Sequence, residues 1–248
     1  MHSHQQAELQ AAAVVIPPHL RTSPSKLFVE TTTRCNLGCF MCVKQAGSSG
    51  VTEGDLAPAT FAALEPAFLH LEALVLNGIG EPLLNPHLEE FIRRARRAMP
   101  ATGWIGFQSN GLLLTNLRAL SLVAAGLDRI CLSIDAASPD TFRRVREGGE
   151  LLDIEHAFAA LVAARERCQR PDFRIGVEFV VMRSNLGELP AALRWAARQG
   201  ASFAIVTHPG RRTRGAARLW SGALPRPRPA GPIAGGPRRR AGLARARP

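Results

Sequence analysis

Tyrosine is absent from this 248-residue sequence, and no apolar run approaches the ~18 residues that a membrane span requires. No lysine or arginine precedes the short apolar stretch at residues 11–16, so the N-terminus lacks the pattern of a signal peptide. These absences predict a cytoplasmic protein with no membrane span. With 46% hydrophobic and 21% charged residues, the chain is not disordered throughout, and it is neither a collagen nor a coiled coil. Its length predicts one domain or at most two.

Acidic residues are absent from the last 39 residues, which contain 11 arginines and no lysine. The preceding 209 residues carry 20 basic and 20 acidic side chains, so the net charge of +11 lies entirely in this tail. Alanine, arginine, glycine and proline occupy 32 of its 39 positions. Such a composition buries too little apolar surface to offset the entropy of ordering. We therefore expect residues 209–248 to be disordered, and residues 1–24 to form a flexible N-terminal segment.

Three explanations of the tail compete. It could be a functional basic arm for RNA or acidic lipid, in which case selectivity for one nucleic acid would persist at physiological salt. It could be a solvated linker. The third explanation is a frameshift, because alanine, arginine, glycine and proline have codons built entirely from G and C, so a GC-rich gene read out of frame yields this mixture. We favour the frameshift, under which the tail binds nucleic acid only non-specifically, through its arginine charge and without sequence preference.

Short β-branched or aromatic runs alternate with helical stretches along residues 25–208, the predicted core domain. The expected strands are residues 27–31, 73–77, 104–108, 129–134, 174–182 and 203–207. Helices are expected at 58–69, 86–98, 115–125, from 139, at 154–168 and at 186–198, with Asn85 as the N-cap of the second. Strands separated by helices indicate βαβ units. The predicted fold class is therefore α/β, a partial (βα)6 TIM-like barrel with parallel strands and its chemistry at the carboxyl ends of the strands.

Three of the five cysteines, Cys35, Cys39 and Cys42, lie within eight residues after the first strand. In a reducing compartment such a cluster indicates metal binding rather than disulfides. Structural zinc requires four ligands, and no fourth cysteine or histidine lies at a matching spacing. Three thiolates instead suit a [4Fe–4S] cluster that leaves one iron open. Cys131 and Cys168 are expected to be small core side chains.

The spacing Cys-x3-Cys-x2-Cys on the first loop resembles the signature of radical S-adenosylmethionine (radical SAM) enzymes. Segment 77–84, Asn-Gly-Ile-Gly-Glu-Pro-Leu-Leu, is similar to the glycine-rich segment of that family, and segment 109–111, Ser-Asn-Gly, is similar to its third strand end. Ser133 and the downstream Arg146 resemble the serine and arginine that contact the ribose and the carboxylate of SAM. Together these motifs cover most of residues 25–207, and they most resemble the maturase branch, whose members also carry a cysteine-rich SPASM domain.

This resemblance implies two cofactors, a [4Fe–4S] cluster and S-adenosylmethionine. It implies that Cys35, Cys39 and Cys42 hold the cluster, and that Met41 stands where the family usually places an aromatic ring against adenine. Glycines 78 and 80 would let the backbone approach SAM closely. Asp135 and Glu178 either line the barrel or are structural acids. The implied SAM-contacting residues are Met41, Gly78, Gly80, Glu81, Ser109, Asn110, Ser133, Asp135 and Arg146.

The implied activity is reductive cleavage of SAM at the cluster to a 5′-deoxyadenosyl radical, used to modify a peptide or to mature a metalloenzyme. A peptide or protein substrate and an external one-electron donor of the flavodoxin or ferredoxin kind would be the partners. Two alternatives stay open at this point. One is a non-catalytic protein that binds nucleic acid through the basic tail, and the other is an inactive, truncated gene product.

Overall fold

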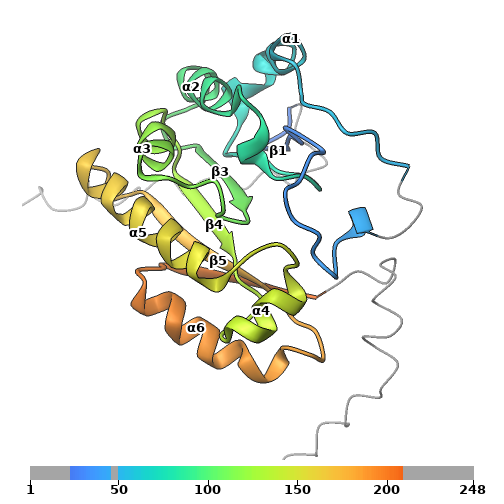
Figure 1. Ribbon diagram of the computed structural model, residues 1–248. Helices are drawn as coiled ribbons and strands as arrows, with labels where there is room; N and C mark the ends of the chain where they lie inside the picture. Colours follow the sequence, from blue (N-terminus) through green and yellow to red (C-terminus); the bar gives the residue numbers. More distant parts are fainter. Residues whose placement is uncertain (1–22, 46–49, 209–248) are drawn as a thin grey trace, which may run out of the picture.

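The computed structural model describes residues 23–45 and 50–208. Within them, six parallel strands form one curled sheet in which the spatial order follows the chain order (Figure 1). This confirms the predicted partial barrel. The predictions about the tail at 209–248, and nearly all of the N-terminal segment, lie outside the described residues. The strands are β1 Lys26–Phe28, β2 Ala73–Val75, β3 Trp104–Ser109, β4 Arg129–Ser133, β5 Arg174–Val180 and β6 Phe203–Thr207.

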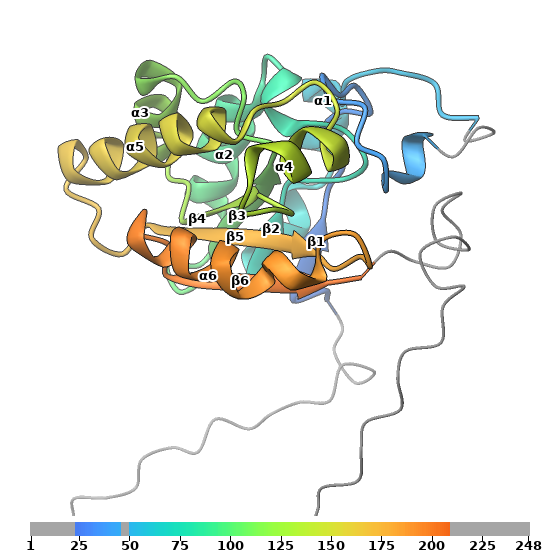
Figure 2. The ribbon, with the colours of Figure 1, turned by 60° about the horizontal axis from the view of Figure 1, so that its bottom comes forward.

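Helices follow the strands, and Figure 2 shows α2, α3, α4 and α5 on one side of the sheet. None of the helices in the described ranges is long and apolar enough to cross a membrane. Short 3-10 turns lie at Val43–Gln45, Glu65–His70, Pro82–Leu84 and Leu186–Glu188. The α-helices are α1 Pro58–Ala62, α2 Leu88–Ala98, α3 Asn116–Ala124, α4 Pro139–Val145, α5 Leu151–Arg167 and α6 Leu189–Arg198.

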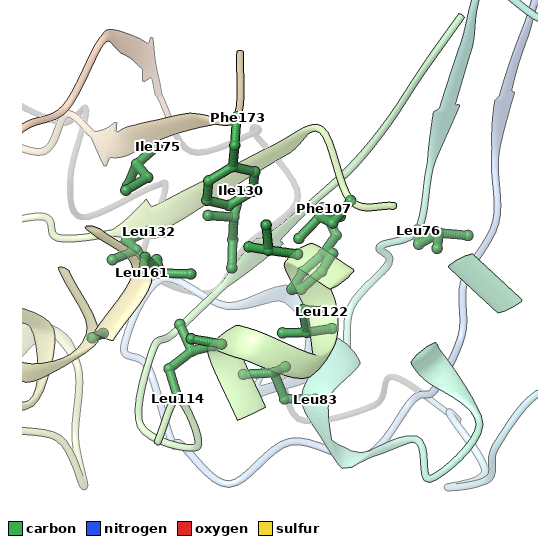
Figure 3. Packing of buried hydrophobic residues seen from close by; sticks show 14 of the residues in the cluster. Leu76, Leu83, Phe107, Leu114, Leu122, Ile130, Leu132, Leu161, Phe173 and Ile175 are labelled. Carbon is green, nitrogen blue, oxygen red and sulfur yellow. The ribbon is translucent and has the colours of Figure 1, made fainter. Parts of the chain in front are cut away.

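The core lies between the convex face of the sheet and these helices, because alternate residues of each strand point to that face. Phe107 of β3, Ile130 and Leu132 of β4 and Ile175 of β5 are buried there. They pack with helical side chains such as Leu122 of α3 (Figure 3). The other residues of the same strands face the concave side.

Two rings cover glycines on this concave face. A Cβ atom at Gly176 would lie 2.3 Å from the ring of Phe203, and one at Gly106 would lie 3.1 Å from the ring of Trp104. The guanidinium of Arg129 stacks 4.1 Å from the centre of the Trp104 indole. These rings lie towards the amino ends of the strands, so the open part of the concave face is at the carboxyl ends.

The expected helix at 86–98 begins later than predicted. Its N-cap is His87, and α2 starts at Leu88. The side chain of Asn85 accepts a hydrogen bond from the backbone nitrogen of His87 at 2.8 Å, and its amide donates to the carbonyl of Thr31 at 2.6 Å. Asn85 was therefore wrongly assigned as the N-cap: it instead joins the segments that follow β1 and β2.

Candidate cofactor site

A cavity of about 370 Å³ opens at the carboxyl ends of the strands. Its size lies within the range of pockets that hold small ligands. Its wall includes eleven of the twelve residues that the sequence assigned to cofactors. These are Cys35, Cys39, Met41, Cys42, Gly78, Gly80, Glu81, Ser109, Asn110, Ser133 and Arg146.

The cysteine loop is held in place by backbone hydrogen bonds to the end of α4. The nitrogen of Gly38 donates to the carbonyl of Glu147, and the nitrogen of Phe40 donates to the carbonyl of Val145, both at 3.0 Å. The loop has little regular structure of its own, so these bonds give partners to backbone groups that would otherwise be left without a hydrogen bond. They keep all three thiols on the wall of one cavity.

Two further contacts tie the same loop to neighbouring strand ends. The backbone nitrogen of Glu81 donates to the carbonyl of Arg34 at 2.8 Å. The side-chain amide of Asn110 donates to the side-chain oxygen of Asn36 at 2.8 Å. Sequence reasoning missed Asn36, whose only signal was its place directly after the first cysteine.

The three thiols suit an iron–sulfur cluster better than a single ion. Within the described ranges, no three histidine, cysteine or acidic side chains are placed to share one metal ion. In a cube each thiolate binds a different iron, so the sulfurs need not converge on one point. Burial raises the pKa of the Cys35 and Cys39 thiols, and the Arg146 guanidinium, 3.8 Å from the Cys39 sulfur, opposes the rise at Cys39 alone. A cationic cluster is the kind of partner that would offset this cost of thiolate burial.

Glu81 is buried and uses its carboxylate to hold the strand ends together. One oxygen accepts from the Ser109 hydroxyl at 2.8 Å and from the nitrogen of Leu83 at 3.1 Å, and the other accepts from the nitrogen of Asn110 at 2.7 Å. Burial raises the pKa of Glu81, and these hydrogen bonds oppose the shift. These three hydrogen bonds make Glu81 a residue that holds the loop after β2 to the end of β3.

The two glycines make close contacts, but with the protein itself. A Cβ atom at Gly78 would lie 2.1 Å from the carboxylate of Glu30, which accepts a hydrogen bond from the nitrogen of Ile79 at 2.6 Å. A Cβ atom at Gly80 would lie 2.2 Å from the carbonyl oxygen of Thr32. The absence of a side chain at these two positions thus makes room for Glu30 and for the backbone leading to Cys35. Both glycines also line the cavity, and a close approach of SAM to them stays a prediction.

Asp135 does not line the cavity, contrary to its assignment among the SAM contacts. Its side chain is fully buried, and one oxygen lies 2.5 Å from the Arg146 guanidinium. The other accepts from the nitrogen of Val180 at 2.5 Å, and the Asp135 backbone has φ of 41°. Positive φ at a residue other than glycine is strained, and the surrounding contacts hold it. Among them is the side-chain amide of Asn185, which donates to the Asp135 carbonyl at 2.9 Å.

The Arg146 side chain is nevertheless not saturated. Its Nε atom is buried and has no hydrogen-bond partner within the described part of the chain. Ser133 lies on the same cavity wall. Buried polar atoms without partners are unusual in native proteins, so the Arg146 Nε is available to a ligand.

Met41 is buried and packs against Val145 and Met182 while it lines the cavity. A thioether in this place can pack against an aromatic ring. Cys131 and Cys168 do not line it. Burial raises the pKa of the Cys131 thiol to about 12, as for a small side chain within the sheet.

Sequence reasoning missed several polar side chains of the cavity wall. Most of these lie at concave-face positions near the ends of strands, where alternation with the core residues was the available signal. The unassigned polar residues on the wall are Asn77, Gln108, Thr207 and His208, whereas Glu178 lines the cavity, which is one of the two roles expected for it.

The family model described as "Radical SAM superfamily" matches residues 29–196, about two thirds of the chain. This chain belongs to the radical SAM superfamily. Enzymes of this superfamily use a [4Fe–4S] cluster and S-adenosylmethionine, and this confirms that the chain is a radical SAM enzyme with the predicted cofactors.

Curated relatives support the same assignment. A tungsten-containing aldehyde ferredoxin oxidoreductase cofactor-modifying protein of Pyrococcus furiosus is 31% identical over 73% of this chain and 51% of its own length. A GTP 3′,8-cyclase of Streptomyces coelicolor is 31% identical over 77% of this chain and 54% of its own length. The radical SAM chain thus spans about half the length of the curated relatives it matches.

Solved structures show the fold. SuiB of Streptococcus suis bound to the precursor peptide SuiA has a TM-score of 0.63 at 11% identity, covering 81% of this chain and 43% of that one. The protein anSMEcpe with bound AdoMet has a TM-score of 0.61 at 17% identity, covering 75% of this chain and 52% of that one.

Proposed function

We propose that this radical SAM chain cleaves S-adenosylmethionine reductively and applies the resulting radical to a peptide or protein, either in peptide modification or in metalloenzyme maturation. The observation that carries the proposal is that three thiols, Ser133 and an unsaturated Arg146 line one cavity. When bound, the cluster and SAM supply one-electron cleavage of a C–S bond and a 5′-deoxyadenosyl radical that abstracts hydrogen.

In this proposal the chain's own residues have distinct tasks. Cys35, Cys39 and Cys42 hold the cluster through their thiolates. Arg146, oriented by Asp135, binds the SAM carboxylate with the donors it does not use internally, because guanidinium and carboxylate form strong charge-assisted hydrogen bonds. Ser133 binds the ribose.

Other wall residues shape the cavity rather than bind through charge. Met41 packs against adenine. Glu81, with Ser109 and Asn110, keeps the strand ends rigid, so that the cavity is preformed and little ordering is needed on binding.

The peptide or protein substrate is supported by two relatives. SuiB is a radical SAM-like structure solved with a precursor peptide, and the Pyrococcus furiosus relative is described as a cofactor-modifying protein. Membership of the maturase branch and the need for an external one-electron donor remain part of the proposal.

The test is anaerobic reconstitution of the full chain with iron and sulfide. A brown protein with absorbance at about 400 nm, which forms 5′-deoxyadenosine from SAM and a chemical reductant, is the expected result. A colourless protein that binds one zinc ion would refute the proposal.

A further inference from the structure

Four polar side chains of the cavity wall have no task in the proposed binding of SAM. Asn77 follows β2, and Gln108, Glu178 and Thr207 lie in β3, β5 and β6. We call these four residues the acceptor row. The strand register places Glu178 directly beside Ser133, so the acceptor row lies next to the proposed ribose contact.

Hydrogen bonding within the acceptor row uses its donors internally. The amide nitrogen of Asn77 donates to the side-chain oxygen of Gln108 at 3.1 Å. Gln108 and Thr207 in turn hydrogen-bond to the Glu178 carboxylate, which can only accept from them when ionised. Two of the three donor-bearing side chains, Gln108 and Thr207, thus serve Glu178, and the third, Asn77, serves Gln108.

The acceptor row leaves hydrogen-bond acceptors without partners. The side-chain oxygen of Asn77 is buried and has no hydrogen-bond partner among the described residues. Glu178 retains acceptor positions, since a carboxylate can accept about four hydrogen bonds. An unpartnered buried acceptor costs free energy until a donor reaches it, so this part of the wall is built for a donor.

The charge of Glu178 favours a cationic donor. Burial raises the pKa of Glu178, the nearby Asp135 carboxylate adds to the rise, and Arg146 lowers it together with the hydrogen bonds. Arg146 forms its ion pair with Asp135 and not with Glu178. A cation placed against Glu178 would recover the free energy lost by desolvating the carboxylate. His208 lines the same cavity and is the other titratable group at this end of β6.

We propose that the acceptor row binds a cationic nitrogen group of the substrate, the ammonium of a lysine or the guanidinium of an arginine, and holds it beside the SAM site. This inference rests on the proposed function and adds the substrate class to it. Glu178 pairs with the cation, Asn77 accepts one of its hydrogens, and Gln108 and Thr207 fix the carboxylate in place.

The experiment uses the reconstituted full chain with SAM bound and measures peptide binding by calorimetry. The probes are three acetylated, amidated pentapeptides, Gly-Gly-X-Gly-Gly, in which X is lysine, norleucine or glutamate. We expect the Kd of the lysine peptide to be lower than that of either other peptide by a factor of about ten or more. A carboxylate removed from water favours a cationic partner strongly over a neutral or an anionic one. Glu178→Gln should abolish this preference without changing the Kd for SAM or the iron content.

Two further variants keep the test decisive. Asn77→Leu retains the approximate shape of the side chain but removes both the amide oxygen and the nitrogen that donates to Gln108, and we expect it to weaken only the lysine peptide. Glu166→Gln, an exposed change on α5, is the matched control and should leave all three affinities unchanged.

The outcomes separate the two proposals. Equal binding of the lysine and glutamate peptides, or no binding of either, overturns the acceptor row and leaves the proposed function intact. Weaker SAM binding in Glu178→Gln with an unchanged peptide preference also overturns it, because the row would then serve SAM itself. A wild-type chain that holds no iron would contradict the proposed function. Peptide selectivity measured on that same chain would still show whether the acceptor row binds a cationic group.

Discussion

Strand β4 has an aspartate–arginine cluster at each end, and the two clusters differ in how completely they are satisfied. At the amino end, the Asp128 carboxylate lies 3.0 Å from Arg96 and 2.9 Å from Arg170, and it accepts from the nitrogen of Ile105 at 2.8 Å. At the carboxyl end, Asp135 pairs with Arg146.

The difference lies in the arginines. Arg96 also donates to the carbonyls of Pro100 and Gly103, both at 3.0 Å, so its guanidinium is used in joining loops. Arg146 keeps a buried Nε without a partner in the described part of the chain and faces the cavity and the Cys39 thiol. The same two residue types therefore join loops at the amino ends of the strands and leave a donor free for a ligand at the carboxyl ends.

The largest expected effect separates the three cysteines that line the cavity from the two that do not. Replacing Cys35, Cys39 or Cys42 with alanine should abolish bound iron and SAM cleavage, because two thiolates hold a cube poorly. Cys131→Ala and Cys168→Ala, away from the cavity, should keep iron near the wild-type amount. Iron determination after reconstitution checks this, and equal loss at all five positions would contradict the assignment.

A steric change at the cavity end should be nearly as severe. In Gly80→Ala the new Cβ would meet the Thr32 carbonyl at 2.2 Å, so the backbone leading to Cys35 must shift. We expect a loss of about 3 kcal/mol or more in the free energy of unfolding, together with most of the iron.

Gly187→Ala is the control for this change, since a Cβ there meets nothing within 4 Å. Denaturant unfolding and iron content measure both variants. If Gly80→Ala kept its iron and stability and weakened only SAM binding, the glycine would serve the ligand after all.

The two aspartates give the direct comparison. Asp135→Asn leaves a buried guanidinium without its counter-charge and should cost roughly 3–5 kcal/mol of stability as well as raising the KM for SAM. Asp128→Asn keeps hydrogen-bonding capacity in a partly exposed network and should cost about 1 kcal/mol with no change in KM. Urea unfolding and SAM-cleavage kinetics test both, and a larger cost at Asp128 would reverse the comparison.

The smallest expected effect concerns acid stability at the amino end. The hydrogen bond from Arg170 lowers the pKa of Asp172, so the folded chain binds this proton less readily than the unfolded chain does. The contribution of Asp172 is present above its unfolded pKa, about 4, and is lost as the pH falls through the lower folded value.

Asp172→Asn should therefore be slightly less stable than wild type at neutral pH, and the two should converge below about pH 3. The shift at Asp135 has the opposite sign, because burial raises the pKa of that carboxyl. Unfolding curves between neutral and acidic pH measure the effect, and a constant gap between the proteins would exclude the Asp172 pair as its cause.

Much of the fold could be predicted because its signals are local. The strand at 203–207 coincides with β6, and 104–108 and 129–134 differ from β3 and β4 by one residue. The predicted helix at 58–69 instead divides into α1 and the turn Glu65–His70, since Pro66 has no N–H to continue the helical bonding.

The chain's local pattern was sufficient for the order of the strands, the parallel sheet and the cysteine loop, because alternation and short spacings are properties of neighbouring residues. The partners of the site were decided only by folding. Arg146 and Cys39 are 107 positions apart, Asn110 and Asn36 are 74 apart, and Asp135 and Val180 are 45 apart. A buried donor or acceptor takes whichever partner the packed strand ends bring within about 3 Å. For that reason the sequence predicted Asp135 to contact SAM, whereas in the tertiary structure Asp135 lies outside the cavity wall and pairs with Arg146.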